Sequence, residues 1–443
     1  MSMELIPGEE WRKVQDLEDR NNLPPDEEFV AAARTNIEKI RKSDLTLKFV
    51  DRHGQPLRGL HVDLQQTKHA FIFGCSAGPT FEAIEKNPAE AARAHNFVRL
   101  FNGTHAKCYW DEKWHQPIEK HQGRREMKQF LAELDWGCAN GMAVRGHPLV
   151  WTVDKAIPQW LRKYPYEKQL EFLEHHVRAL VASTDKRIRT WDMVNEMLWE
   201  PVLKNLAYRD WPHIEPIDEI ADFIAPTIRW ARDEDPTACY CLNEYGLEFT
   251  YTKMKNVTAP MQRQRFVELV DALRQRGAAP DAIGTQAHIG KWFPMALVAR
   301  TFDDLAKAGV ALHVSEFWAH HRDHPNLDGL SPDQLERDQA TYVANYYTVA
   351  FGTPGVEQIS HWGDDSFFKG NGWRTTHAYD AIYDLVKRQW WTRTRLTTDD
   401  AGVAKVRAFQ GDYLYRIKAA NGDTLSRNLR VEPEAATVLT VTV

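Results

Sequence analysis

Residues 189–196 read RTWDMVNE, a short apolar run that ends in an amide and a carboxylate. Residues 191–194 have the length and composition of a buried strand. Such strands usually stop at turn residues such as Gly, Pro, Asn or Asp, so a Glu directly after the Asn is unusual. The pair Asn195-Glu196 therefore predicts partners on neighbouring strands.

Seven further apolar runs have the same form and alternate with helix-length segments. Eight strands, each followed by a helix, are the count and order of an α/β fold of the (β/α)₈ TIM-barrel type. An open doubly wound sheet would need a glycine-rich phosphate turn after an early strand, and FGCSAGPT (73–80) does not match one. The predicted strands are 70–74, 97–102, 142–151, 189–196, 239–244, 282–289, 310–317 and 356–363.

The ends of the chain have a different pattern, which predicts small accessory β segments beside the barrel of residues 70–388. Residues 1–69 are expected to hold an amphipathic helix at 26–43 and a β-hairpin with its turn at His53-Gly54. Residues 389–443 show short alternating strands, typical of a small C-terminal β domain. Neither terminal piece has enough strands for independent stability, so the two are expected to pack together.

The charge distribution excludes several classes of partner. The net charge is −6 with no long basic run, which gives no footprint for nucleic acid or an anionic membrane. The longest apolar runs are strand-sized, too short to span a bilayer. The N-terminal residues lack the apolar core of a secretory signal, which predicts a cytoplasmic protein if the chain is full length, or a secreted or periplasmic one whose signal has been removed. Nothing in the sequence indicates the oligomeric state.

Polar side chains gather where the predicted strands end, which is the end of a barrel where reacting groups lie. Glu196 ends the fourth strand and Glu316 the seventh, so the two carboxylates face each other across the barrel mouth. Two facing carboxylates are the equipment of a glycosidase. The 18 His and five Cys show no zinc-type spacing, so neither a metal nor another cofactor is expected. The other polar strand ends are His147 with Trp151, Asn243 with Glu244, Gln286 with His288, and His361 with Trp362.

Five motifs in this order resemble glycoside hydrolase family 10, the retaining endo-β-1,4-xylanases. They are RGHPLVW (145–151), TWDMVNE (190–196), IGTQAHI (283–289), HVSEF (313–317) and HWGDDSF (361–367). The resemblance implies a (β/α)₈ barrel that hydrolyses xylan or xylo-oligosaccharides by double displacement without a cofactor.

The resemblance also implies roles for individual residues. By motif, Glu196 is similar to the acid/base of the family and Glu316 to its nucleophile. Asn195 would bind the sugar 2-hydroxyl, and His288, with Gln286 beside it, would keep the nucleophile ionised. His147, Trp151 and Trp362 would line the same subsite, with Trp362 as its floor.

One segment departs from the family pattern. Where the family usually has a Glu-Asn pair and a Lys before a Trp, this chain reads FNGTHAKCYW (101–110), with Tyr109 in the Lys position. Tyr109 either stacks on a sugar or belongs to the core. This departure leaves open the same chemistry on another β-linked glycan. A carbohydrate-binding barrel without activity is a further alternative, but it would require loss of one Glu, and both are present.

Overall fold

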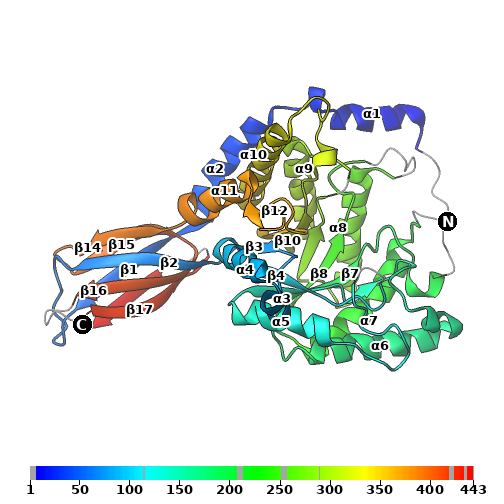
Figure 1. The fold of residues 1–443 in the computed structure, drawn as a ribbon, viewed down its shortest axis with the longest axis horizontal. Helices are drawn as coiled ribbons and strands as arrows, with labels where there is room; N and C mark the ends of the chain where they lie inside the picture. Colours follow the sequence, from blue (N-terminus) through cyan, green and yellow to red (C-terminus); the bar gives the residue numbers. More distant parts are fainter. Residues whose placement is uncertain are drawn as a thin grey trace.

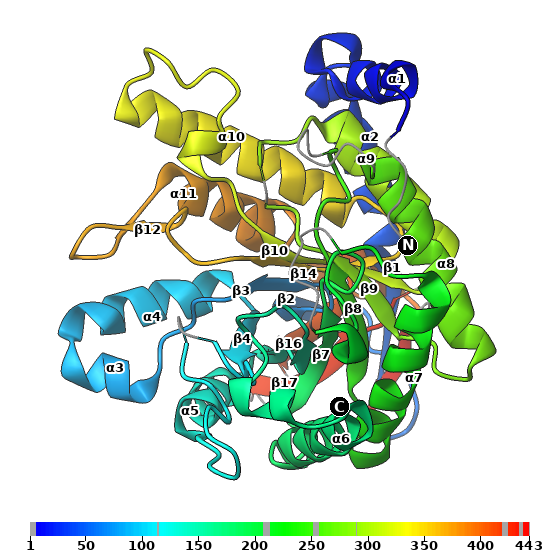
Figure 2. The same cartoon turned by 90° about the vertical axis from the view of Figure 1, so that its right-hand side faces the viewer.

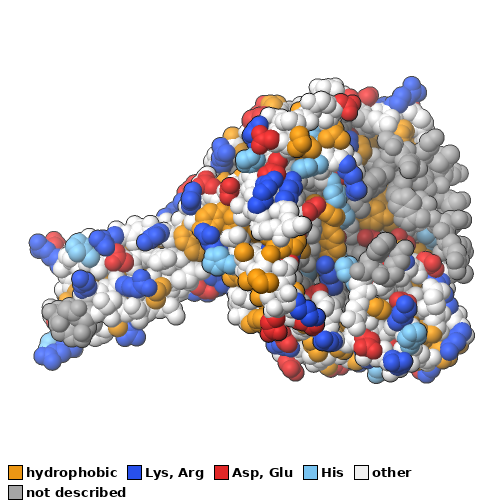
Figure 3. Space-filling view, in the orientation of Figure 1, with side chains coloured by type: hydrophobic (Ala, Val, Ile, Leu, Met, Phe, Trp, Pro, Cys, Tyr) orange, Lys and Arg blue, Asp and Glu red, His pale blue; other side chains and the backbone are white. Residues whose placement is uncertain are grey.

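The computed structural model describes residues 6–112, 115–206, 213–250, 257–288, 290–418, 424–433 and 437–442. Figure 1 shows two parts, a helix-covered strand assembly and a β assembly that projects from one side of it. On the face shown in Figure 3, acidic and basic side chains are interspersed over both parts. Among the described residues no helix is both long and apolar enough to cross a membrane.

A closed ring of eight parallel strands forms the centre of the larger part. Each strand pairs in parallel with its neighbours, and pairing of β5 with β7 closes the ring. Short β6 (Val150–Trp151) extends the β5 side and pairs with β7. The predicted barrel is thus confirmed. Its strands are β3 (Ile72–Cys75), β4 (Gly103–Lys107), β5 (Ala143–His147), β7 (Ile188–Asn195), β8 (Cys239–Glu244), β9 (Ala282–Thr285), β10 (Ala311–Phe317) and β11 (Val356–His361).

Helices surround these strands, as Figure 2 shows from the side opposite the projecting β assembly. Several begin at a Thr, Asn or Ser whose side chain accepts a backbone N–H of the first turn, as Thr258 and Ser331 do. Helix α2 (Asp26–Ile40) packs on α9 and α10, which confirms the amphipathic N-terminal helix. The other α-helices are α1 (Gly8–Glu18), α3 (Phe81–Lys86), α4 (Pro88–Leu100), α5 (Lys128–Ala139), α6 (Tyr166–Ala182), α7 (Ile217–Glu234), α8 (Ala259–Gln275), α9 (Met295–Leu305), α10 (Pro332–Phe351) and α11 (His377–Asp384).

The second predicted strand, 97–102, is wrong. Residues 97–100 are the last turn of α4, and the second barrel strand is β4, immediately after it. Phe97 and Leu100 are three residues apart and both are buried, so the run is apolar because one helix face packs against the barrel. A run of this length does not distinguish a buried helix turn from a strand.

The projecting assembly is built from both ends of the chain. One sheet has the order β15-β1-β18 and the other β14-β2-β16-β17. Their facing apolar side chains form one cluster that includes Leu47, Phe49, Tyr413 and Tyr415. The strands are β1 (Lys42–Val50), β2 (His61–His69), β14 (Arg393–Thr397), β15 (Val403–Phe409), β16 (Gly411–Lys418), β17 (Thr424–Val431) and β18 (Thr437–Thr442), while β12 (Phe368–Lys369) and β13 (Arg374–Thr375) form a separate two-stranded ribbon.

The predicted N-terminal β-hairpin is wrong. Strand β1 pairs with β15 and β18, whereas β2 pairs with β14 and β16. The turn at His53-Gly54 therefore connects two different sheets. Each of the two strands pairs with strands from the C-terminal part of the chain, and the two resulting sheets bury each other's apolar faces. A hairpin of β1 and β2 alone would leave these faces exposed. The division into residues 1–69, 70–388 and 389–443 stays a prediction.

Candidate active site

The predicted site residues lie at the carboxyl ends of the barrel strands. His147, Trp151 and Asn195 are the last residues of β5, β6 and β7, and Glu196 follows directly. Glu316 is the next-to-last residue of β10. Gln286 and His288 follow β9, and Trp362 follows β11. His147 and Trp362, 215 residues apart in the sequence, thus meet at one end of the barrel.

Glu196 is held by two N–H donors. Trp151 Nε1 donates to Oε2 at 2.8 Å, and Gln286 Nε2 donates to Oε1 at 2.9 Å. Its backbone has a φ of 62°, a left-handed conformation that is uncommon outside glycine, and its N–H donates to the Asn243 carbonyl at 2.8 Å. Such strain persists where surrounding contacts fix it, and here it directs the carboxyl into the site.

Burial raises the pKa of Glu196 above its ordinary value. The hydrogen bond from Gln286 opposes this shift, and the negative charge of Glu316 adds to it. A carboxyl in this environment keeps its proton to higher pH than an exposed one. Glu196 is therefore suited to donate a proton.

Glu316 is buried but receives polar contacts on both oxygens. Asn243 Nδ2 donates to Oε1 at 2.7 Å, and His288 Nε2 lies 3.2 Å from Oε2. Hydrogen bonds from N–H groups stabilise an ionised carboxylate and fix its orientation. Asn243 and His288 therefore fix the orientation of the Glu316 carboxyl group.

Amide side chains connect the two carboxyls in one network. Asn195 Oδ1 accepts from Asn243 Nδ2 at 2.9 Å and from Gln286 Nε2 at 3.4 Å. The same Asn243 amide also binds Glu316, and the same Gln286 amide binds Glu196. Because its oxygen is occupied, Asn195 has its NH₂ group available as a donor to a ligand.

A buried ionic chain lies beneath the site. His147 Nδ1 is 2.8 Å from Asp192 Oδ2, and Arg145 binds the same carboxylate through two nitrogens. Burial alone would raise the pKa of Asp192, but the Arg145 charge and the His147 hydrogen bond hold it well below its ordinary value. Asp192 is thus ionised and orients the His147 ring, whose Nδ1 is 3.9 Å from Glu316 Oε1.

Aromatic rings form one wall of the site. Tyr109 is only 5% exposed and lies against the rings of His115, His147 and Trp151, with centroid distances of 4.8, 5.6 and 5.9 Å. Burial raises the pKa of the Tyr109 hydroxyl well above its ordinary value, and the charges of both glutamates add to this shift. Trp362 packs against His147 at 5.0 Å. Tyr109 is therefore close to both glutamates while most of its surface is buried.

The sequence predicts no role for two contributors to the site, Asn243 and Asp192. Asn243 appears in it only as a polar strand end, and its contacts with Asn195 and Glu316 depend on the closure of the barrel. Asp192 lies within the apolar run of β7, and a charged residue inside such a run is the one feature of the sequence that indicates a role for it. Glu244, also at a strand end, instead accepts the backbone N–H groups of Leu198 and Tyr245, and so holds the loop that carries Glu196.

Within the described ranges, no group of three or more His, Cys, Asp or Glu side chains is arranged to hold a metal ion. All five cysteines are free thiols, and burial raises the pKa of each.

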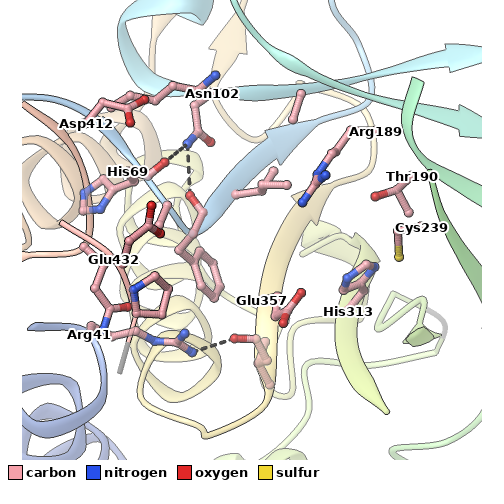
Figure 4. A pocket seen from close by; sticks show the side chains of 18 of the residues that line it. Arg41, His69, Asn102, Arg189, Thr190, Cys239, His313, Glu357, Asp412 and Glu432 are labelled. Carbon is pink, nitrogen blue, oxygen red and sulfur yellow. Dashed lines mark hydrogen bonds between the residues drawn. The ribbon is translucent and has the colours of Figure 1, made fainter. Parts of the chain in front are cut away.

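A separate cavity of about 830 Å³ lies at the opposite end of the barrel, next to the projecting β assembly. Figure 4 shows Arg189, Thr190, Cys239, His313 and Glu357 around it. None of the predicted site residues lines this cavity. His313 nevertheless connects the two ends, because its Nδ1 is 3.1 Å from an Arg145 nitrogen in the ionic chain beneath His147.

The fold and the site define a (β/α)₈ barrel with paired glutamates at the ends of its strands, an arrangement that can transfer a proton and form a covalent bond at a sugar carbon. The model of glycosyl hydrolase family 10 matches residues 81–388. The chain belongs to this family.

Several curated proteins are similar to this chain. Anti-sigma-I factor RsgI6 of Acetivibrio thermocellus is 25% identical over an alignment of 398 residues that covers 87% of this chain and 46% of that protein. Endo-1,4-beta-xylanase 2 of Arabidopsis thaliana is 25% identical over 87% of this chain and 33% of its own length. Endo-1,4-beta-xylanase B of Thermotoga neapolitana is 27% identical over 68% of this chain and 81% of its own length. The chain thus spans less than half the length of the first two relatives.

Solved structures agree with the fold. GH10 from Paenibacillus barcinonensis superposes with a TM-score of 0.57 at 20% identity, covering 72% of this chain and 96% of that one. Xylanase 10B from Thermotoga petrophila, in complex with xylobiose, gives a TM-score of 0.54 at 24% identity, covering 72% of this chain and 95% of that one. At these identities the likeness shows the barrel fold alone.

Proposed function

We propose that the protein hydrolyses β-1,4-linked xylan or xylo-oligosaccharides with retention of anomeric configuration. Membership of glycosyl hydrolase family 10 supports the reaction class. The names of relatives, endo-1,4-beta-xylanases among them, and the xylobiose complex of one structural neighbour support the substrate. The partner is therefore a β-linked oligosaccharide or polysaccharide.

One observation carries the proposal, namely that two buried carboxyl groups lie in one amide network with different partners. Burial raises the pKa of Glu196, whereas Glu316 accepts an amide N–H and faces His288. A pair of carboxyl groups with different surroundings divides naturally into an acid and a nucleophile.

In the first step, Glu316 attacks the anomeric carbon while Glu196 gives its proton to the departing glycosidic oxygen. The carbon–oxygen bond to the leaving sugar breaks as the glycosyl–Glu316 ester bond forms. In the second step, ionised Glu196 takes a proton from water, whose oxygen displaces Glu316 from the anomeric carbon. Two displacements on opposite faces return the original configuration.

The neighbouring side chains have supporting roles in this scheme. The Asn195 NH₂ group donates to the sugar 2-hydroxyl, a contact that strengthens in the transition state. Gln286 and Trp151 hold the Glu196 carboxyl, and His288 holds Glu316. His147, Tyr109 and Trp362 supply the wall and floor against which the sugar packs.

The direct test is incubation of the protein with linear xylan, xylo-oligosaccharides and other β-linked glycans, followed by identification of the products. Release of xylo-oligosaccharides from xylan is expected. Cleavage of another β-glycan with xylan left intact would instead support the alternative substrate that the departure at Tyr109 leaves open.

Variants of the two glutamates test the assignment of roles. Glu316→Ala cannot form the ester, so it should be inactive even on an aryl xylobioside with a good leaving group. Glu196→Ala should form the ester from that substrate and then stall, because no base activates water. Azide, a nucleophile that needs no base, should relieve the stall and give a glycosyl azide of retained configuration.

The opposite pattern of azide rescue would exchange the two roles. Sugar binding without turnover by the wild-type protein on every glycan would favour the non-enzymatic barrel, although both glutamates are present in the chain.

A further inference from the structure

Two lysines lie beside the tryptophans of the site. Lys107 is the last residue of β4, and its Nζ is 5.5 Å from the centre of the Trp362 ring. Lys155 follows β6, and its Nζ is 4.6 Å from the centre of the Trp151 ring. The cation–π attraction holds each ammonium group near a ring that lines the site.

Neither ammonium group has a carboxylate within ion-pair distance in the part of the chain that the structure describes. Glu133 accepts the backbone N–H of Lys107 at 2.8 Å, not its side chain. Glu200 lies near Lys155, but burial raises the pKa of Glu200 to about 8, so it is mostly uncharged at pH 7. Lys107 is also half-buried, where a charge without a partner is costly.

Both lysines lie on the same side of the site. The charges of Lys107 and Lys155 both act on His115, whose pKa falls to about 4, chiefly through burial. The His115 ring stacks on Tyr109 with a centroid distance of 4.8 Å. In the β4–β5 register Lys107 pairs with His147, which faces the site. The two ammonium groups therefore flank the Tyr109 wall.

We infer that Lys107 and Lys155 bind a carboxylate carried by the glycan, so that the preferred substrate is a β-linked chain with uronic acid substituents. This inference rests on the proposed function. A glycan bound at the two glutamates brings its substituents to the wall that Tyr109 and His115 form, and a carboxylate there supplies the acceptor that the lysines lack. Lysine acts as a compact point charge and so fits a group whose position varies with the attachment point.

The test compares two polymers that differ only in charge, glucuronoxylan and the same polymer with its carboxyl groups chemically reduced to alcohols. The wild-type protein should have a kcat/KM on the acidic polymer at least about fivefold higher, the size expected for one partly exposed ion pair. In Lys107→Met and in Lys155→Met the ratio of the two kcat/KM values should fall towards one.

Lys163→Met is the matched control, because Lys163 also lies over an aromatic ring, at 5.0 Å from the Tyr164 ring centre, but on the exposed surface. This variant should keep the wild-type ratio. Equal kcat/KM values of the wild-type protein on the two polymers would overturn the inference, as would loss of the ratio in Lys163→Met.

Linear xylo-oligosaccharides separate this inference from the proposed function. If the protein cleaves them but does not distinguish the two polymers, only the role of the lysines is wrong. If it cleaves neither polymer nor the oligosaccharides, the proposed function itself fails.

Discussion

Removal of the hydrogen bond from Trp151 to Glu196 tests whether Glu196 acts as the acid, because a single N–H group is lost. Trp151→Phe keeps an aromatic ring but removes the Nε1–H that donates to Glu196 Oε2 at 2.8 Å. This bond lowers the pKa of Glu196, against the larger effect of burial. A hydrogen bond to a charged group contributes about 1.5–3 kcal/mol, and about 1.36 kcal/mol corresponds to one pH unit.

The sign follows from the role of Glu196 as an acid. Loss of the donor makes the ionised form less stable, so Glu196 should keep its proton to higher pH. The alkaline limb of the kcat/KM profile should then move upward by about one to two pH units. A xylo-oligosaccharide is the appropriate substrate, because its leaving sugar requires protonation whereas an activated aryl group does not.

Trp362→Phe is the matched control, since Trp362 packs against His147 and Lys107 and, among the described residues, donates no hydrogen bond to either glutamate. Its activity is expected to change without movement of the alkaline limb. The reasoning is refuted if the limb in Trp151→Phe stays in place or moves to lower pH.

Three further changes address stability. In Gly146→Ala, the new Cβ would lie 2.2 Å from the Trp191 ring, so the free energy of unfolding should fall by about 1–3 kcal/mol or more. Calorimetry should show this loss as a lower Tm. Gly372→Ala, whose new Cβ meets nothing within 4 Å, should keep the wild-type Tm. Asp192→Asn leaves a buried guanidinium without its carboxylate and should cost about 3–5 kcal/mol in denaturant unfolding. Because folding lowers the pKa of Asp192, this cost should be complete above about pH 4 and shrink only at lower pH. Because burial raises the pKa of Glu200 to about 8, Glu200→Gln should gain Tm relative to the wild type as pH rises from about 4.5 to 8, and a constant difference would contradict that pKa.

The barrel was predictable because seven of its eight strands lie in apolar runs, six of which end in polar residues. The exception is β4, GTHAK, which is buried at its first four residues although only one of them is apolar. Its His105 packs inside the barrel near the ionic chain of Arg145 and Asp192, whereas the neighbouring Thr104 faces helix α5 at Gly137. A strand buried among polar groups lacks the apolar signal, whereas the neighbouring helix turn has it, so the sequence predicts a strand at 97–102 instead of β4.

The predicted pairing of the N-terminal strands is wrong for a different reason. Strands β1 and β2 have the alternation of a hairpin, but each pairs with strands more than 300 residues away in the sequence. Local alternation predicts a strand and its buried face, not its partner. The same limit applies to Asn243, because its contacts with Asn195 and Glu316 join three strands that only closure of the barrel brings together.

The central claim, retention through a glycosyl–Glu316 ester, is tested most directly by the anomeric form of the first product. Proton NMR of a xylo-oligosaccharide digest, recorded before mutarotation, distinguishes the two anomers by their coupling constants. The two-step mechanism predicts that the newly formed reducing end appears first as the β anomer and converts to the equilibrium mixture later. Initial release of the α anomer would show a single displacement by water and would contradict the assignment of Glu316 as the nucleophile.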